Sequence, residues 1–220
     1  LSFLGESSLK IRSLTILQPN MNIGDIDSLV NLEVLSMEGS LKKDLDISIF
    51  KFLKYLNCVY STRLRNLEIA FSLKHLSLSG FKMDDLSIMR NLKLLESVAL
   101  YNTHIKSLYG IGNLINLKKV LIDKAPKLKN LCGFTEQNSN METVEVFNAK
   151  NLRDIIALKY LHNLKTLYLQ RISDIETLSF LSNISNLDRI VVSSNVDDKD
   201  YSFVETIPHR FILGYQHNNL

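Results

Sequence analysis

Between Leu95 and Leu117 the apolar residues follow two different spacings. Val98 and Leu100 alternate with polar or small residues, which predicts a strand with one buried face. After Leu100 the spacing becomes three, which suits short helical or 3₁₀ turns, in the series Ile105, Leu108, Ile111, Leu114 and Leu117. A strand followed by a period-three return is one coil of a solenoid.

The same strand opening, an apolar residue followed by two more at the third and fifth positions after it, recurs nine times along the chain. Neighbouring copies are 20 to 24 residues apart, and they start at Ile11, Leu32, Leu53, Leu73, Leu95, Leu117, Met141, Leu164 and Leu187. A fixed period in this range is the signature of the leucine-rich repeat, which has one strand and one helical or 3₁₀ segment in each coil.

Three segments resemble the consensus sequence of one group of leucine-rich repeats. LVNLEVLSM, GIGNLINLKKVLI and LHNLKTLYL are similar to the short repeats of about 22 residues in internalins and in the regulatory subunits of nuclear protein phosphatase. The resemblance covers Ile11 to Val192. It implies an α/β fold, a right-handed solenoid with a parallel concave β-sheet and a convex side of 3₁₀ turns and short helices. The family's inward Asn is replaced here by Ser40, Ser61, Phe81, Thr103 and Ala125.

The pattern divides the chain into three parts. Residues 1–10 are expected to form an N-terminal cover or partial repeat, 11–196 the array of about nine repeats, and 197–220 a C-terminal cap. In the cap, Phe203, Val204, Ile207 and Phe211 are expected to pack on the last coil, and Arg210 to Gly214 to add a strand. Gln137 to Asn140 is expected to form a surface bulge of the longest repeat. Asn precedes Leu at the end of several coils, where its side chain can satisfy backbone groups at the bend; these residues are Asn31, Asn116, Asn163 and Asn186.

Composition narrows the classes of function. Apolar residues make up 45% of the chain and the net charge is +3, with lysines spread along the chain, so neither nucleic acid nor an anionic membrane is indicated. No apolar run is long enough to span a bilayer. Cys58 and Cys132 lie at or near apolar repeat positions and are expected to be buried thiols. This favours the cytoplasm, or secretion and the cell surface if the chain is a fragment. We expect a monomer, and the abundance of Lys, Asn and Ile indicates an AT-rich genome and so a bacterial or a protist source.

Candidate binding residues lie on the outward face of the predicted sheet or just beyond its strands. Tyr and Arg often anchor protein interfaces, and aromatic residues are not needed by the core at these positions. The alternative is that Tyr simply suits strands. The predicted concave binding set is Tyr55, Tyr60, His75, Tyr101, Lys119, Asp123, Glu145, Phe147, Tyr168, Gln170 and Arg189.

Motifs for chemistry are weak. Gly110-Ile111-Gly112 lacks the third Gly and the Lys of a phosphate loop, and the five His residues share no spacing. Asp197-Asp198-Lys199-Asp200 reads as a solvated turn. Asn183-Ile184-Ser185 is a glycosylation sequon that matters only in a secreted chain. We therefore predict no catalytic residues, no metal site and no cofactor.

The sequence thus predicts a non-enzymatic module that binds another protein on its concave face. Three alternatives stay open: an adhesion or virulence module of the internalin kind, an immunity or inhibitor protein that masks a toxin or enzyme, and the recognition part of a larger effector enzyme.

Overall fold

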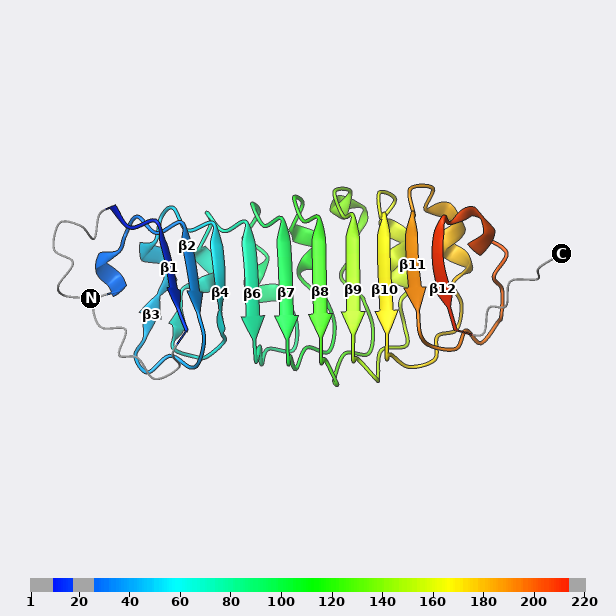
Figure 1. Cartoon of the computed structure of the whole chain (residues 1–220), viewed down its shortest axis with the longest axis horizontal. Helices are drawn as coiled ribbons and strands as arrows, with labels where there is room; N and C mark the ends of the chain where they lie inside the picture. Colours follow the sequence, from blue (N-terminus) through cyan, green and yellow to red (C-terminus); the bar gives the residue numbers. More distant parts are fainter. Residues whose placement is uncertain (1–9, 18–25, 214–220) are drawn as a thin grey trace.

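One parallel sheet runs the length of the molecule (Figure 1). The computed structural model describes residues 10–17 and 26–213. Within them, ten strands pair in chain order: β1 (Ser13–Ile16), β2 (Val34–Met37), β4 (Tyr55–Val59), β6 (His75–Ser79), β7 (Ser97–Tyr101), β8 (Lys119–Asp123), β9 (Thr143–Phe147), β10 (Thr166–Gln170), β11 (Arg189–Val192) and β12 (His209–Ile212). Two further strands, β3 (Leu45–Asp46) and β5 (Leu64–Arg65), form a separate small sheet.

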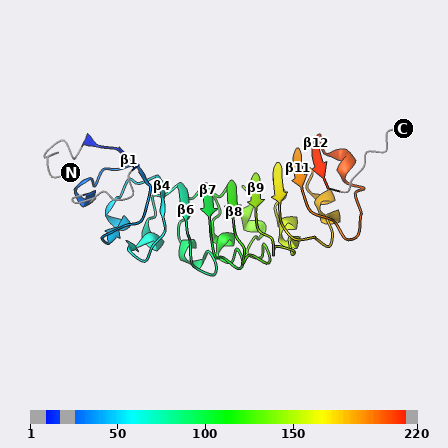
Figure 2. The ribbon, with the colours of Figure 1, turned by 60° about the horizontal axis from the view of Figure 1, so that its bottom comes forward.

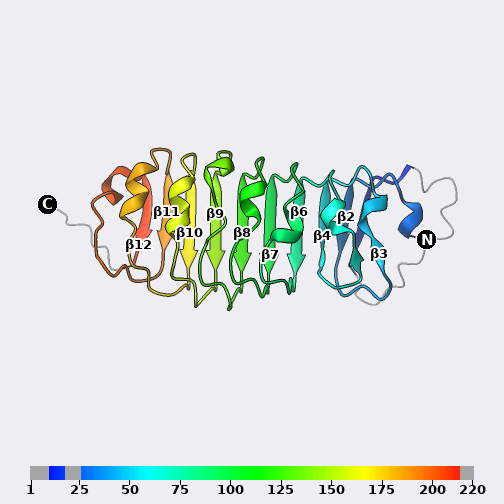
Figure 3. The same ribbon diagram turned by 180° about the vertical axis from the view of Figure 1, so that it is seen from behind.

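Short 3₁₀ helices fill the side behind the sheet (Figure 3), where the period-three spacing predicts them. The strands lie on the inner side of a gentle curve (Figure 2), so the sheet is concave. The helices are η2 (Ile26–Ser28), η3 (Ile47–Ile49), η4 (Leu67–Ile69), η5 (Ser87–Met89), η6 (Ile111–Asn113), η7 (Glu136–Asn138), η8 (Ile156–Tyr160), η9 (Ser179–Asn183) and η10 (Val204–Thr206).

The core is a set of columns that run along the solenoid. Leu76, Val98, Val120 and Val144 pair directly from β6 to β9, and each is buried. Because side chains alternate along a strand, the same register places the first and third residues of each strand of this sheet on the concave face, and also the fifth residue of the five-residue strands. Each coil therefore buries its apolar residues against the coils on either side.

Asparagines at the bend into the strands link neighbouring coils. The Nδ2 of Asn116 donates to the carbonyl of Lys93 at 2.8 Å, and that of Asn163 donates to Ser139 at 2.8 Å. Asn140 and Asn186 donate in the same way to Ile115 and His162, at 2.9 and 3.4 Å. The prediction that these side chains satisfy backbone groups at the bend is confirmed for Asn116, Asn163 and Asn186.

The column that holds Asn in the family is varied here. Thr103 is buried, and its Oγ1 donates to the carbonyl of Phe81 at 3.1 Å. Ser194 Oγ donates to the carbonyl of Ile172 at 3.3 Å. Ala125 is buried in the same column with no polar side-chain atom. Hydroxyl groups therefore replace the missing amide in only some coils.

The longest repeat differs from the prediction of a surface bulge. Asn138 is fully buried, and its Nδ2 donates to the carbonyls of Ile111 at 3.0 Å and Leu114 at 3.4 Å. Its Oδ1 accepts from the backbone N–H of Thr135 at 3.0 Å, which forms half of a capping box. Asn138 thus occupies a core position that an apolar residue such as Leu92 or Leu114 holds in other coils, and its amide is satisfied by the preceding coil and by its own turn.

The C-terminal prediction is partly wrong. Phe203, Val204 and Ile207 are buried as expected, but Phe211 is 56% exposed. It pairs with Val191 on the outward row, and Ile212 is the buried residue of that strand. The chain changes from a 3₁₀ turn to a strand after Ile207, so an inward helical spacing cannot continue to Phe211. The predicted strand at Arg210 to Gly214 begins one residue earlier, at His209.

The two cysteines differ in their burial. Cys58 is buried and burial raises the pKa of its thiol to about 12, but Cys132 is exposed, so the expectation that both thiols are buried is wrong for Cys132. Cys132 follows the inward Leu131 and points away from the core as a result. The predicted N-terminal cover, apart from Lys10, lies outside the described residues.

A row of charged side chains immediately precedes the strands, and we call it the strand-entry row. Glu33 pairs with Lys54 at 2.6 Å, Glu142 with Lys165 at 3.0 Å, and Glu96 with both Lys74 and Lys118 at 2.9 Å. Hydrogen bonds from Lys118 and Lys74 lower the pKa of Glu96 to about 2. The row therefore pairs opposite charges across neighbouring coils.

Replacing Asn138 with Ala should lower the free energy of unfolding by about 1–3 kcal/mol, because the buried carbonyls of Ile111 and Leu114 would each lose one of two donors and the Thr135 N–H would lose its acceptor. Urea denaturation followed by circular dichroism measures this change. Gln137→Ala, at an exposed neighbouring position, is the control and should change stability little. Equal stability of Asn138→Ala and Gln137→Ala would contradict the assigned role.

Glu96→Gln should remove a pH-dependent contribution to stability. The folded-state pKa of Glu96 lies below its ordinary value of 4.5, so its stabilising effect is complete above that value and is lost as the pH falls toward 2. Wild type should exceed Glu96→Gln in denaturation midpoint at pH 6, and the difference should close between pH 4.5 and 2. Glu136→Gln controls for the change of charge. A difference that stays constant across this range would show that the lysine pairs do not stabilise the fold.

Candidate concave binding surface

The outward residues divide the concave face into two halves. Over the first strands they are mainly small and polar, as in Thr15, Ser36, Asn57 and Ser77. From β8 onward, apart from Thr143 and Thr166, they are mainly large or charged: Lys119, Leu121, Asp123, Glu145, Phe147, Tyr168, Gln170, Arg189, Val191 and Phe211. The buried columns run through both halves, so the core does not require this difference.

In the first half, polar side chains mainly bond to one another. Asn57 Nδ2 donates to Ser36 Oγ at 3.0 Å, and His75 Nδ1 lies 2.9 Å from Ser97 Oγ. The rings of Tyr55 and His75 are 6.2 Å apart. These cross-strand pairs use much of the hydrogen-bonding capacity of this half within the protein itself.

In the second half, apolar rings lie beside a charged pair. The rings of Phe147 and Tyr168 are 6.3 Å apart on β9 and β10. Lys119 Nζ and Glu145 Oε1 are 2.9 Å apart, and only 16% of the Glu145 side chain is exposed. Arg189 lies further along on β11, in the same row as Lys119.

A hollow of about 330 Å³ opens where these strands end. We call it the concave hollow. Four of the eleven predicted residues line it, namely Tyr101, Asp123, Phe147 and Gln170, together with Leu121, Asn148 and Arg171. The structure thus gathers residues from four consecutive coils around one depression.

A chain of hydrogen bonds fixes the polar side of the concave hollow. Asn148 Nδ2 donates to Asp123 Oδ1 at 2.6 Å, and Arg171 Nη1 donates to Asn148 Oδ1 at 3.3 Å. The carboxylate and the guanidinium are therefore held at opposite ends of one amide. This arrangement offers a partner an acceptor and a donor beside an apolar wall.

The backbone beyond these strands turns through the left-handed region. Asn102, Lys124, Asn148 and Arg171 all have φ between 51° and 56°. Asn adopts this conformation more readily than most residues, so an Asn at position 148 is a sequence signal for the left-handed turn. Lys124 and Arg171 give no such signal, because Lys and Arg rarely adopt it. The sequence prediction omitted Asn148 and Arg171 because both lie one residue beyond the outward row.

Tyr60 is not on the concave face, contrary to the prediction. Its ring packs edge-to-face on the buried Phe81, with ring centres 4.9 Å apart, and its side chain contributes to the core. The register pairs Val59 with Ser79 and Ser79 with Tyr101, so Val59 holds the outward position. The prediction placed Tyr60 one residue out of register.

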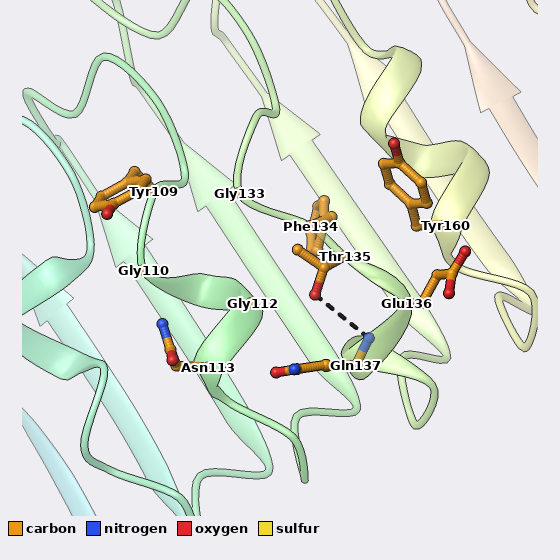
Figure 4. Close-up of a pocket in the computed structure, with 10 residues that line it drawn as sticks. All are labelled: Tyr109, Gly110, Gly112, Asn113, Gly133, Phe134, Thr135, Glu136, Gln137 and Tyr160. Carbon is orange, nitrogen blue, oxygen red and sulfur yellow. Dashed lines mark hydrogen bonds between the residues drawn. The ribbon is translucent and has the colours of Figure 1, made fainter.

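A second hollow, of about 650 Å³, lies on the 3₁₀ side between Tyr109 and Tyr160 (Figure 4). Its floor contains the glycines that superficially resemble a phosphate loop. A Cβ on Gly110 would lie 2.7 Å from the carbonyl carbon of Leu86, and one on Gly112 would lie 2.7 Å from the carbonyl oxygen of Gly133. Close packing between coils therefore explains these glycines.

Over residues 10–17 and 26–213, no three His, Cys, Asp or Glu side chains are grouped so that they could share a metal ion. In the same ranges, no helix has the length and apolar character needed to cross a bilayer.

This coil geometry, with one strand and one short 3₁₀ segment in each repeat, is the leucine-rich-repeat solenoid. Two internalins are among the solved structures that share it. Internalin C2 from Listeria monocytogenes matches with a TM-score of 0.60 and 19% identity, over 84% of this chain and 81% of that one. The functional domain of InlJ from Listeria monocytogenes matches with a TM-score of 0.66 and 16% identity, over 91% of this chain and 48% of that one.

A third similar structure is that of TLR13 in complex with ssRNA13, with a TM-score of 0.56 and 20% identity, over 77% of this chain and 26% of that one. No family model matches the sequence, and no curated protein matches it. The comparisons confirm the resemblance at the level of the fold: the chain is an internalin-like leucine-rich repeat protein in its architecture.

Lys124→Gly should stabilise the protein by roughly 0.5–1 kcal/mol, because relief of the left-handed backbone outweighs the extra entropy of Gly in the unfolded chain. Thermal or urea denaturation measures the change. Lys127→Gly is the matched control, because Lys127 is exposed and does not have a positive φ. This substitution should destabilise the protein. If both substitutions destabilise the protein equally, the strain assigned to Lys124 is wrong.

Proposed function

We propose that this protein binds another protein on the concave face, through the half from β8 to β12 together with Tyr101 at the end of β7. The observation that carries the proposal is the change in the outward rows from small polar residues to aromatic, aliphatic and charged ones, over a core that does not change. Surfaces of this composition, with Tyr, Phe and Arg among apolar neighbours, anchor protein interfaces.

The concave hollow is the proposed centre of this surface. Tyr101, Leu121 and Phe147 supply an apolar wall, and the Asp123–Asn148–Arg171 chain orients polar groups beside it. Its volume of about 330 Å³ suits one or two partner side chains rather than a whole domain. The surface continues past the hollow to Phe211 and Leu213, which are 56% and 44% exposed.

In this proposal the protein acts as a monomer in the cytoplasm and performs no chemistry itself. The partner supplies the activity that binding blocks, localises or presents. Analytical ultracentrifugation tests the monomer, and fractionation of the source organism tests the compartment.

Site-specific photo-crosslinking tests the binding face. A benzophenone amino acid placed at Tyr101 or Tyr168 should capture a defined partner from the source organism's lysate, read by mass spectrometry. The same amino acid at Tyr109 or Tyr160, tyrosines on the 3₁₀ side, is the matched control and should not capture it. Tyr101→Ala combined with Tyr168→Ala should abolish capture through a third concave probe at Arg189.

Two results would overturn the proposal. One is capture of the same partner with equal yield from both faces, and the other is capture only through Tyr109 or Tyr160. In a further outcome, the lysate yields no adduct while culture medium or host extract yields one that forms only through the concave probes. That result would support the proposed binding face and show that the cytoplasmic location is wrong.

A further inference from the structure

Large apolar side chains are exposed at the same corner of five consecutive coils, on a surface that the proposed function does not use. The corner is where the chain leaves the 3₁₀ side and bends into a strand, at the upper edge of the sheet in Figure 1. The five residues are between 39% and 57% exposed: Val30, Phe52, Phe71, Leu94 and Ile115. We call them the apolar edge stripe.

The fold itself does not require apolar residues at this corner. The next three coils hold Ser139-Asn140, His162-Asn163 and Ser185-Asn186 at the equivalent positions, and all six residues are exposed. Their asparagines donate to the preceding coil, as described above. The same bend is therefore built from two polar residues in these three coils, and from one exposed apolar residue beside a polar or charged one in the five coils of the stripe.

The geometry of the stripe matches an α-helix laid along the solenoid axis. Neighbouring strands are about 4.8 Å apart, and coils spread slightly away from the inner side of the curve. An α-helix advances about 5.4 Å per turn, so one side chain from each turn can meet one side chain from each coil. A helix of about 15 residues would cover the whole stripe.

The charge around the stripe favours an acidic helix. The five corner dipeptides are Val30-Asn31, Lys51-Phe52, Phe71-Ser72, Lys93-Leu94 and Ile115-Asn116, and their two charged residues are both lysines. Lys93 Nζ donates to the neutral carbonyl of Asn113 at 2.8 Å, so this contact leaves its charge unbalanced. On the strand side, three lysines, Lys54, Lys74 and Lys118, pair with two glutamates, Glu33 and Glu96. These five residues therefore carry one net positive charge.

We propose that the apolar edge stripe binds an amphipathic α-helix of a partner protein, with one apolar side chain per turn and carboxylates on its flanks. Exposed apolar runs of this extent mark interaction surfaces, and helix recognition commonly uses such evenly spaced anchors. This site is separate from the concave face and does not depend on the function proposed above.

A display library of helical peptides tests the proposal. Leucine is fixed once per turn along one face, the flanking positions are randomised, and selection uses the whole protein as bait. The counter-selection bait carries Phe52→Asn, Phe71→Ser and Leu94→Asn, which are residues that the chain's own later coils use at this bend. We expect enriched peptides to carry Asp and Glu on both flanks, and the triple variant to weaken their binding at least about tenfold.

Further variants separate the contribution of the lysine charges from that of the apolar side chains of the stripe. Lys51→Glu with Lys93→Glu should reverse the flank preference from acidic to basic peptides. Ile156→Ser removes an exposed apolar residue outside the stripe and should leave binding unchanged, as should the Tyr101→Ala/Tyr168→Ala variant of the concave face.

Several results would overturn the inference. One is that the wild-type bait enriches no peptides relative to the triple-variant bait. Another is that the enriched peptides lack Asp and Glu on their flanks. A third is that these peptides bind the triple variant as tightly as wild type. Self-association by ultracentrifugation, or binding to vesicles rich in phosphatidylserine, that the triple variant removes would assign the stripe to a second copy or to a membrane instead. The unfolding midpoint of the triple variant, expected to equal or exceed that of wild type, shows that any loss is not due to misfolding.

Discussion

The contact between each coil and the next is the interaction on which everything else in this structure depends. A single coil has one strand and one short turn, and it cannot bury its leucines alone. Pairing in constant register, as from Leu76 through Val98 to Val120, aligns every inward side chain into a column. The same register aligns the outward side chains into rows. The chemical character of a surface on this protein is therefore set by the residues at one repeat position in successive coils. Substitutions at that position in several coils change a continuous stripe of the surface.

Sequence periodicity was sufficient to predict the fold because it records that register directly. Alternation in the strands and the spacing of three between them each match a backbone geometry, and the described structure follows both. The two errors have different causes. Tyr60 lies one residue beyond the outward position, which the constant register of Cys58, Leu78 and Leu100 gives to Val59. Phe211 was misassigned because the period changes at Ile207, where the last turn becomes a strand.

The candidate site was only partly predictable for a different physical reason. Outward strand positions can be listed from a period of two, which found Tyr101, Phe147 and Tyr168. The concave hollow also depends on turn residues beyond the strands. Arg171 reaches it from a left-handed backbone that arginine rarely adopts, and the hydrogen bond to Asn148 that holds its guanidinium crosses from one coil to another. Neither feature has a signature in one coil's sequence. The role of Asn138 was missed similarly, although the spacing of Thr135 and Asn138 fits a capping box.

The concave face and the apolar edge stripe are complementary in position. The outward rows of the concave face are mainly large or charged from β8 onward, whereas the apolar edge stripe occupies the coils up to Ile115, and both residues of the bend are polar in the next three coils. Because the inter-coil contacts of the core are satisfied throughout, selection for folding alone would not divide the surface in this way. A solenoid can carry two such surfaces without conflict, since each lies on a different side of the coil and neither uses the buried columns. The division therefore favours one rigid array that holds two partner segments at a fixed separation.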